Sequence, residues 1–262
     1  MKDLRVTIVQ SALQWEDVNA NLGMFGKALQ GLPPAGTDLI VLPEMFSTGF
    51  SMKASELAED MEGKAVTWMK KTAASKKCVV TGSLIIKENG NYYNRLVWMR
   101  PDGTCETYDK KHLFRMGEEN NTYTAGKKKI IVELNGWKIC PLVCYDLRFP
   151  VWSRNVNNAY DCLIYVANWP DVRSYPWRQL LVARAIENQA YVIGVNRIGV
   201  DGNDMAHSGY SSVMDPRGQV ISNTKPDKPS VETVTLSWSA LEEFRKAFPV
   251  GMDADEFEIN PS

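Results

Sequence analysis

The chain is short of histidine and has no evident cysteine pairing, and both shortages limit the chemistry open to it. Its 262 residues include two histidines, His112 and His207. The cysteines number five, an odd count that does not suit a disulfide framework in a chain of this length; they are Cys78, Cys105, Cys140, Cys144 and Cys162. Cys140 and Cys144 form a C-x3-C pair, but no second cysteine pair follows at zinc-site spacing, so we expect no metal.

Net charge and long apolar runs are also lacking. The 30 Lys and Arg residues and 31 Asp and Glu residues leave a formal net charge of -1, which offers no bulk attraction for nucleic acid or an anionic membrane. No stretch approaches the roughly 18 apolar residues of a membrane span, and the N-terminal MKDLRVTIVQ lacks the apolar region of a signal peptide. We therefore expect no nucleic-acid partner, no membrane partner and a cytoplasmic location.

The composition is that of an ordinary globular protein, with 44% hydrophobic and 23% charged residues. The length allows one large α/β domain or two small ones. No linker, repeat or low-complexity tract interrupts the chain. We therefore expect a single domain over residues 1–262.

Strand-like and helix-like segments alternate along this domain. Short apolar runs predict strands at 4–10, 37–44, 78–86, 92–99, 130–134, 137–144, 161–168 and 191–199, a further strand after the 101–103 turn, and a strand–turn–strand unit at 210–221. Helices are predicted at 17–31, 63–75, 177–190 and 237–248. Asn89-Gly90 and Asn135-Gly136 predict hairpin turns. The alternation favours an α/β fold with mixed sheets.

Three polar residues interrupt the apolar pattern at the ends of predicted strands. Glu44 follows LIVLP, Lys110 follows the hairpin strand in YDKKH, and Cys144 ends WKICPLVC. Loops at strand ends are where α/β folds place ligands and catalysts. Taken alone, each has an ordinary explanation: a buried thiol for Cys144, a solvated lysine, and a surface or helix-terminus carboxylate. A rival scheme pairs Cys144 with His112 or His207 as the base.

The segments around these residues resemble a known family. LPEMFSTGF, YDKKHLF and CYDLRFP are similar to the three signatures of the nitrilase (carbon–nitrogen hydrolase) superfamily, each of which contributes one member of a Glu-Lys-Cys triad. The resemblance continues through ARAIENQAYVIGVNR and YSSVMDPRGQVI. HLFRMGEEN, CYDLRFPVWSRN and YVANWP are most similar to the omega-amidase-like branch, which acts on 2-oxo dicarboxylic acid monoamides.

The resemblance implies a role for individual residues. The family lysine stands two places before a His-Leu pair, which selects Lys110. The acid at the end of the early apolar strand is Glu44, and the nucleophile is Cys144. Many members carry a second glutamate shortly before a small-residue-Gly pair. Glu118 and Glu119 compete for that place, and counting back from 125–126 favours Glu119.

These residues suffice for hydrolysis of an amide. Cys144 as thiolate is expected to attack the carbonyl, and the charge of Lys110 to favour the thiolate and then the oxyanion. The family implies that the N–H of Tyr145 is a second oxyanion donor. Glu44 is expected to move the protons, and Glu119 to position Glu44 or the substrate. No step requires a metal or an organic cofactor.

Substrate contacts are predicted from chemistry alone. The free carboxylate of such a substrate needs a cation, and Arg173 in NWPDVRS is the candidate. Arg148 is expected instead to pair with Asp146 or another acid. Three aromatic residues are predicted to wall the pocket, with core packing as the alternative for the first and third: Phe46, Tyr145 and Trp169.

The family also implies an architecture and an assembly. The fold is expected to be a four-layer α-β-β-α sandwich, paired as a homodimer or higher homo-oligomer through the helical segment RFPVWSRN and the C-terminal region. The sequence does not choose among 2-oxoglutaramate, 2-oxosuccinamate, another omega-amide and a carbamoyl compound. The alternatives are a carbamoylase or another aliphatic amidase, and a catalytically inactive binding protein on the same fold. The intact set of Glu44, Lys110 and Cys144 argues against the inactive protein.

Overall fold

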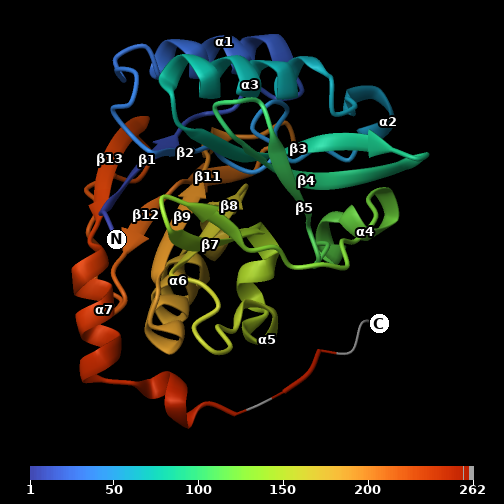
Figure 1. Cartoon of the computed structure of the whole chain (residues 1–262). Coiled ribbons are helices and arrows are strands. Elements are labelled where there is room, and N and C mark those ends of the chain that lie inside the picture. Colours follow the sequence, from blue (N-terminus) through green and yellow to red (C-terminus); the bar gives the residue numbers. More distant parts are fainter. Residues whose placement is uncertain (256, 260–262) are drawn as a thin grey trace.

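Two β-sheets lie face to face between two layers of helices (Figure 1). The structure is a computed structural model that describes residues 1–255 and 257–259. Helices α1 (Val18–Ala28) and α3 (Lys64–Lys76) cover the outer face of one sheet. Helix α6 (Ser174–Asn188) and the short α5 (Pro150–Ser153) cover the outer face of the other. The predicted four-layer α-β-β-α sandwich is confirmed.

The first sheet has the strand order β13-β1-β2-β3-β4-β5. The pairs β1–β2 and β2–β3 are parallel, and the other three pairs are antiparallel, so the sheet is mixed as predicted. Its strands are β1 Leu4–Gln10, β2 Leu39–Val41, β3 Val79–Glu88, β4 Asn91–Met99, β5 Cys105–Asp109 and β13 Ser230–Leu236.

The second sheet has the order β12-β9-β8-β7-β6, with β7, β8 and β9 parallel. Its strands are β6 Val132–Leu134, β7 Trp137–Val143, β8 Cys162–Ala167, β9 Tyr191–Asn196 and β12 Ser212–Met214. A separate hairpin and the remaining helices are β10 Ile198–Val200, β11 Ala206–Ser208, α2 Ala54–Leu57, α4 Glu119–Thr122 and α7 Trp238–Ala247. None of the helices in these described residues is long and apolar enough to cross a membrane.

Alternation along the buried strands builds two cores. In β1, Leu4, Val6 and Ile8 contact the core between the sheets, whereas Val9 contacts the core beneath α1 and α3. Because side chains of a strand point alternately to its two faces, a strand covered on both faces has an almost continuous apolar sequence. This explains why the buried strands were recognisable from the sequence.

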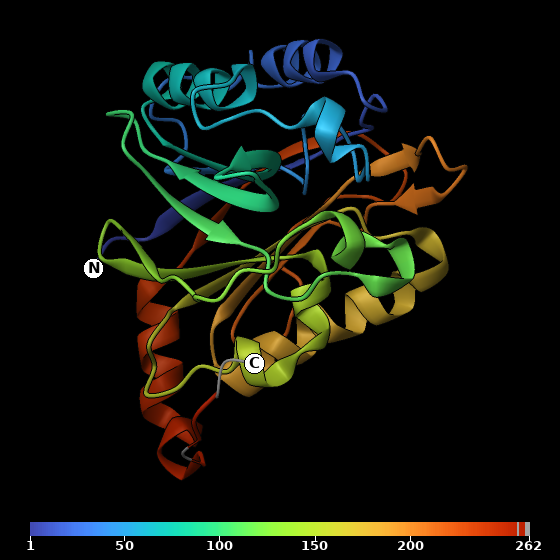
Figure 2. The ribbon, with the colours of Figure 1, turned by 90° about the vertical axis from the view of Figure 1, so that its right-hand side faces the viewer.

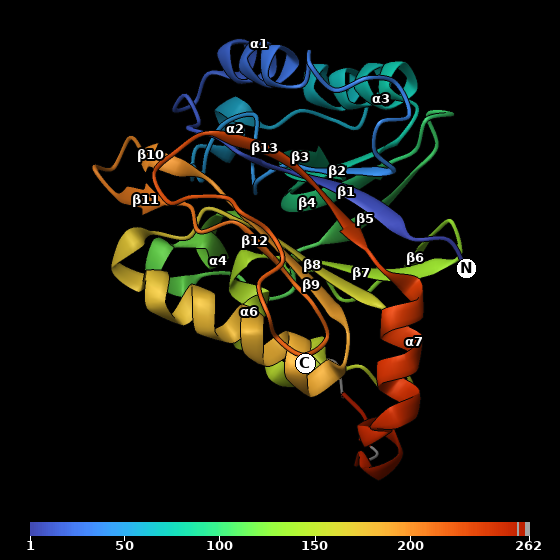
Figure 3. The same cartoon turned by 90° about the vertical axis from the view of Figure 1, so that its left-hand side faces the viewer.

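Several local predictions hold and several do not. Asp17 caps α1 by accepting a hydrogen bond from the N–H of Ala20 at 2.9 Å, but the helix ends three residues before the predicted residue 31. The strand predicted at 37–44 is only three residues long, because strand pairing ends at residue 41 and a turn begins at residue 44. The second strand of the 210–221 unit is reduced to one bridge, Met214–Val220. Strand β13, which the sequence analysis did not predict, pairs with β1 at the sheet edge (Figure 3).

Helix α6 forms where it was predicted, but its buried side is a different one. The sequence pattern rests on Leu180, Ala183 and Ile186, yet Ile186 is 52% exposed. The side chains that pack on the second sheet are instead Trp177 and Leu181. This side of the helix packs closely on the sheet. Leu181 and Trp177 lie against Gly194 of β9, where an added Cβ would come within 2.5 Å of Leu181.

Candidate active site

Three polar residues at strand ends meet inside the molecule. Glu44 follows β2, Lys110 follows β5 and Cys144 follows β7. Their exposed fractions are 0%, 1% and 9%. Two of these strands belong to the first sheet and one to the second, so the residues come together where the two sheets face each other. Helix α4, the β10–β11 hairpin and the start of α6 lie on one side of the molecule (Figure 2).

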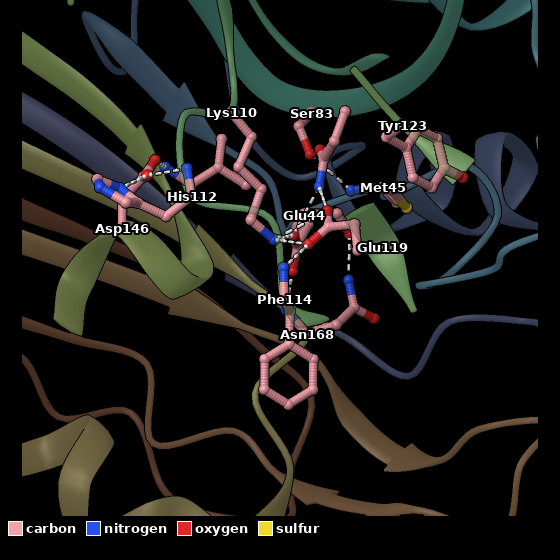
Figure 4. Close-up of polar contacts among 12 residues, drawn as sticks. Glu44, Met45, Ser83, Lys110, His112, Phe114, Glu119, Tyr123, Asp146 and Asn168 are labelled. Carbon is pink, nitrogen blue, oxygen red and sulfur yellow. Dashed lines mark hydrogen bonds and ion pairs between the residues drawn. The ribbon is translucent and has the colours of Figure 1, made fainter. Parts of the chain in front are cut away.

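Lys110 binds two carboxylates. Its Nζ donates to Glu44 Oε1 at 2.8 Å and to the two oxygens of Glu119 at 3.0 and 2.9 Å (Figure 4). The neighbouring Glu118 is exposed and takes no part in this cluster; its backbone φ of 57° turns the chain before α4. The structure therefore places Glu119, and not Glu118, beside Lys110.

The two carboxylates differ in how completely they are bonded. Glu119 accepts from Lys110 at both oxygens, from Asn94 Nδ2 at 3.0 Å and from the N–H of Phe114 at 2.6 Å. All four acceptor sites of a carboxylate are thus occupied. These donors require an ionised carboxylate, because a protonated oxygen would direct its O–H at another donor. This requirement outweighs burial, which raises the pKa of Glu119 against the opposing charge of Lys110.

Glu44 keeps one acceptor site open. Its Oε1 accepts from Lys110 and from Asn94 at 2.8 Å, and its Oε2 accepts from the N–H of Asn168 at 2.8 Å. One acceptor site of Oε2 has no donor among the described residues, and the carboxylate lies close enough to Cys144 to raise the pKa of its thiol. Of the two carboxylates, Glu44 is therefore the one able to take a proton from Cys144.

The charges of the cluster shift the pKa values of Lys110 and Cys144. Burial disfavours the Lys110 cation, but Glu119 and Glu44 together hold the pKa of Lys110 well above its usual value. Burial and the nearby Glu44 raise the pKa of the Cys144 thiol well above its usual value, against the effect of Lys110. Burial and the adjacent carboxylate thus favour the protonated form of the Cys144 thiol, whereas Lys110 favours the thiolate.

A strained turn presents the thiol. Cys144 has φ of +44°, a region that costs a non-glycine residue about 1–3 kcal/mol, and it opens a 3₁₀ helix (Cys144–Arg148) directly after β7. Asp146 stabilises this turn by accepting from the N–H of Val143 at 3.0 Å and from the hydroxyl of Tyr108 at 2.7 Å. The turn therefore depends on a buried carboxylate two residues after the cysteine.

The two histidines have other positions than the rival scheme requires. His112 binds Asp146 through its Nδ1 at 2.7 Å, and its ring stacks on Phe149 with centroids 3.7 Å apart. His207 lines the same cavity as Cys144, but its Nδ1 is bound to the carbonyl of Met205 at 2.9 Å. Within the described residues, no hydrogen bond joins either histidine to Cys144.

A cavity of about 630 Å³ opens over the cluster. Lys110 and Cys144 line it, and the aromatic side chains of its wall are Trp15, Phe50, Phe114, Tyr145 and Trp169. Two of the three predicted aromatic residues, Tyr145 and Trp169, are thus found there. Phe46 is not: it is fully buried on the other side of the first sheet, with ring centroids 5.6 Å from Phe25 and 5.9 Å from Trp68.

Phe46 does not reach the cavity, contrary to the prediction, because of the local backbone conformation. Met45 has φ of +41°, so the chain reverses immediately after Glu44 and aims the next side chain at the helical layer. Phe50, four residues later, returns to the cavity and lies 5.3 Å from the Nζ of Lys110. The reversal at Met45 lies directly after the strand predicted at 37–44, and the strand pattern gave no indication of it.

Both candidate arginines line the cavity. The guanidinium of Arg148 lies 5.1 Å from the ring of Trp169, and that of Arg173 lies 5.4 Å from the ring of Phe114. The expected salt bridge between Arg148 and Asp146 is not formed, because the oxygens of Asp146 are occupied by the donors of the turn. No ion pair involving either arginine occurs among the described residues.

Two asparagines of the cluster were missed by the sequence analysis. Asn94 lies within the strand-like YYNRLVWM, and Asn168 ends the buried run DCLIYVAN. Asn168 also donates its side-chain amide to the main-chain carbonyl of Glu44. The available signal was a lone amide inside an apolar strand, which a sequence reader cannot distinguish from an ordinary edge or bulge residue. Among the described residues, no group of three or more His, Cys, Asp or Glu side chains is arranged to hold a metal.

Comparison with known proteins agrees with this geometry. The sequence model described as carbon–nitrogen hydrolase matches residues 5–246. The chain is 48% identical to the omega-amidase YafV of Escherichia coli strain K12, covering 99% of this chain and 100% of the relative. It is 35% identical to the 2-oxoglutaramate amidase of Bacillus subtilis strain 168, covering 81% and 83% of the two chains.

A solved structure is similarly close. A CN-hydrolase superfamily protein from Xanthomonas campestris, which carries an arsenic adduct in its active site, superposes with a TM-score of 0.97 at 43% identity, covering 99% of this chain and 100% of that one. The fold and the sequence together define an enzyme that hydrolyses carbon–nitrogen bonds, and the chain belongs to the carbon–nitrogen hydrolase family. Within the nitrilase superfamily it lies in the omega-amidase branch, as the sequence analysis predicted.

Proposed function

We propose that the chain hydrolyses the omega-amide of small 2-oxo dicarboxylic acid monoamides, of the 2-oxoglutaramate or 2-oxosuccinamate type, to the acid and ammonia. The observation that carries this proposal is a buried Glu44–Lys110–Glu119 cluster beside Cys144, which opens into a cavity lined by two arginines. Neither arginine has a carboxylate partner within residues 1–255 and 257–259. The names of the relatives from E. coli and B. subtilis support the substrate class.

In the first half of the reaction, Cys144 Sγ forms a bond to the amide carbon while Glu44 takes the thiol proton. Concerted transfer fits a thiol whose protonated form is favoured by burial and by Glu44. The oxyanion is stabilised by Lys110 and by the N–H of Tyr145, which stands in the first helical turn and has no helical carbonyl behind it. Protonated Glu44 then passes its proton to the nitrogen, the C–N bond breaks, and ammonia leaves a thioester.

In the second half, water attacks the thioester and Glu44 accepts one of its protons. The C–S bond breaks, and the proton held by Glu44 returns to the Cys144 sulfur. Lys110 keeps its charge throughout. One bifurcated N–H can serve both oxygens of Glu119, and a second binds Glu44, which leaves the third N–H of Lys110 for the oxyanion.

The carboxylate at the far end of the substrate is assigned to the arginines. Arg173, predicted from the sequence, and Arg148, predicted to be occupied elsewhere, both reach the cavity with their guanidinium groups held by aromatic rings. A guanidinium matches a carboxylate with two parallel hydrogen bonds. Tyr145 and Trp169 line the same cavity as the arginines and the thiol.

Ammonia release tests this proposal. The enzyme is assayed with 2-oxoglutaramate, 2-oxosuccinamate, neutral aliphatic amides and N-carbamoyl amino acids. The 2-oxo monoamides are expected to give the highest kcat/KM, and Cys144→Ala to abolish turnover while the exposed Cys105→Ala does not. Preference for carbamoyl compounds would overturn the substrate, and undiminished turnover by Cys144→Ala would overturn the nucleophile.

The substrate anchor has its own test. Arg173→Gln and Arg148→Gln are expected to raise KM for the acidic amides at least tenfold, as the loss of about 1.4 kcal/mol of charged hydrogen bonding requires, with little change for a neutral amide. Arg217→Gln is the matched control, because Arg217 also lies over an aromatic ring, Phe244, but outside the cavity. Equal effects on acidic and neutral amides would remove both arginines from the substrate site.

We also propose three properties of the whole molecule: one domain over residues 1–262, a cytoplasmic location, and assembly as a homodimer or higher homo-oligomer. The core between the sheets, shared by strands from both halves of the chain, supports one domain. Free cysteines support a reducing compartment. Exposed apolar side chains on α5, on α6 and near the C-terminal end support pairing.

A further inference from the structure

Asn94 occupies the centre of the buried cluster. It stands in the middle of β4, and its side chain is fully buried. Its amide nitrogen donates to Glu44 Oε1 at 2.8 Å and to Glu119 Oε1 at 3.0 Å. A side-chain amide has two N–H bonds, so both are used, one for each carboxylate.

The orientation of this amide is fixed by the two anions. The Oδ1 of Asn94 is buried and has no hydrogen-bond partner among the described residues. Turning the amide over would give Oδ1 no better partner, because it would then point at both carboxylates. An unpaired buried carbonyl oxygen is unfavourable. The two hydrogen bonds that the same amide donates to Glu44 and Glu119 offset this cost. Packing alone would be satisfied by an apolar residue of similar volume.

The absence of charge on Asn94 matters as much as its donors. With Lys110 cationic, Cys144 neutral and both carboxylates ionised, the cluster has a net charge of -1. A second cation at position 94 would cancel this charge and weaken Glu44 as a base. An amide supplies two N–H donors without doing so. Its main chain also receives the N–H of Lys110 at 3.0 Å, so the same residue helps place the lysine.

We infer that Asn94 is a positioning residue of the reaction, which holds Glu44 beside Cys144 by tying it to Glu119, whose four acceptor sites are filled. The inference rests on the proposed role of Glu44 as the base. Among the described residues, the titratable groups that face Glu44 are Lys110 from the end of β5, Glu119 from α4, Tyr123 directly after α4 and Cys144 from the end of β7. The N–H of Asn168, after β8, also faces it.

The pH profile tests the inference. Asn94→Ala removes one of the three donors to Glu44, so the acid limb of kcat/KM is expected to move up by about one pH unit. At neutral pH kcat is expected to fall roughly tenfold or more, with KM nearly unchanged because Asn94 does not line the cavity. Asn94→Asp, which replaces a donor with a third carboxyl, is expected to move the limb further. Asn91→Ala, an exposed asparagine at the start of β4, is the control.

A second measurement needs no substrate. Alkylation of Cys144 by iodoacetamide, followed by mass spectrometry of its peptide, is expected to show the same displacement of the acid limb in Asn94→Ala. This arm separates the inference from the substrate proposal, since it responds even if no 2-oxo amide is turned over. If the alanine variant does not fold, Asn94→Ser, which keeps one donor, is expected to give an intermediate displacement. An unchanged limb in any folded variant overturns the inference, even where activity falls.

Discussion

Lys110 is, in the part of the chain that the structure describes, the one cation paired with the two buried carboxylates of the site. Both of its partners are fully buried, as is the lysine itself. Buried charges are tolerated when they are paired and hydrogen-bonded, and removing one partner typically costs about 3–5 kcal/mol because the others are left uncompensated. The residue therefore contributes to the fold and to the chemistry at the same time, and substitution should reveal both.

Lys110→Met is expected to lower kcat by roughly 10²–10³-fold through loss of an oxyanion donor. It should also destabilise the protein at neutral pH. Without the cation, the carboxyl groups have higher pKa values in the folded variant than in the unfolded chain. The loss of unfolding free energy is therefore small at a pH below the pKa of the unfolded chain, and it grows as the pH rises through the pKa of the folded variant. Chemical denaturation from pH 4.5 to 8 measures this. Lys111→Met, next in sequence and partly exposed, is the control. A deficit independent of pH would contradict the electrostatic explanation.

The sequence could predict those site residues that break an apolar pattern at a strand end. Glu44, Lys110 and Cys144 all do so, and their order matches the family signatures. Phe46 was assigned to the pocket because it stands near Glu44, but a positive φ at Met45 reverses its direction. Backbone reversals at non-glycine residues leave no mark in the sequence, so the direction of a neighbouring side chain cannot be derived from it.

At the scale of elements, the segment after β5 and the turn after β7 depend on each other. Asp146 accepts from the main chain and ring of His112, from Tyr108 and from Val143. It thereby binds the segment that carries Lys110 to the turn that carries Cys144. From the sequence, Arg148 was expected to pair with Asp146 or with another acid. A carboxylate that fixes a turn by accepting main-chain N–H groups cannot be told from an ion-paired one by spacing alone.

The β10–β11 hairpin provides the clearest pH effect on stability. His207 of β11 is buried, and burial together with the nearby Arg197 lowers its pKa to about 4, against a weaker effect of Asp201. The unfolded chain takes up a proton near pH 6.5, before the folded one does. Stability from this group is therefore full above about pH 6.5 and is lost as pH falls toward about 4, by about 3 kcal/mol in total.

His207→Gln should remove this slope. The free energy of unfolding of the variant, measured by urea denaturation between pH 4.5 and 7.5, is expected to vary less with pH than that of the unchanged protein. Asn203→Ala, an exposed change in the same hairpin, should keep the slope. Parallel pH dependences for the His207 variant and the unchanged protein would show that the histidine is not held neutral by burial.

At the scale of the molecule, the site exists because two sheets face each other. Glu44 and Lys110 come from the first sheet, and Cys144 and Asn168 from the second. The sheets could be predicted from the sequence, because strands covered on both faces form continuous apolar runs and these runs alternate with helix-like segments along the chain. They could not predict β13, whose alternating exposed and buried residues in SVETVTL describe a half-solvated edge strand. Its position depends on pairing with β1, more than 200 residues earlier, and such pairing is not encoded locally.

The outer helical layer of the second sheet is where the proposed homodimer is expected to form. Val151 of α5 and Ile186 of α6 are 56% and 52% exposed, and Met252 near the C-terminal end is 84% exposed. Exposed apolar side chains of this kind mark interaction surfaces, and a two-fold axis lets one patch cover its own copy.

Light scattering during gel filtration should give the mass of two 29.5 kDa chains. Ile186→Asp and Val151→Asp are expected to shift the protein toward the monomer, because each would bury a carboxylate without a partner. Val231→Asp is the control: Val231 is 41% exposed, but its strand β13 is the edge strand of the first sheet and not part of this layer. A monomeric unchanged protein, or equal dissociation by the β13 variant, would contradict pairing through this layer. Because the cluster of Glu44, Lys110 and Cys144 is complete within one chain, a monomeric variant should keep its kcat, so assembly and chemistry can be separated in the same preparation.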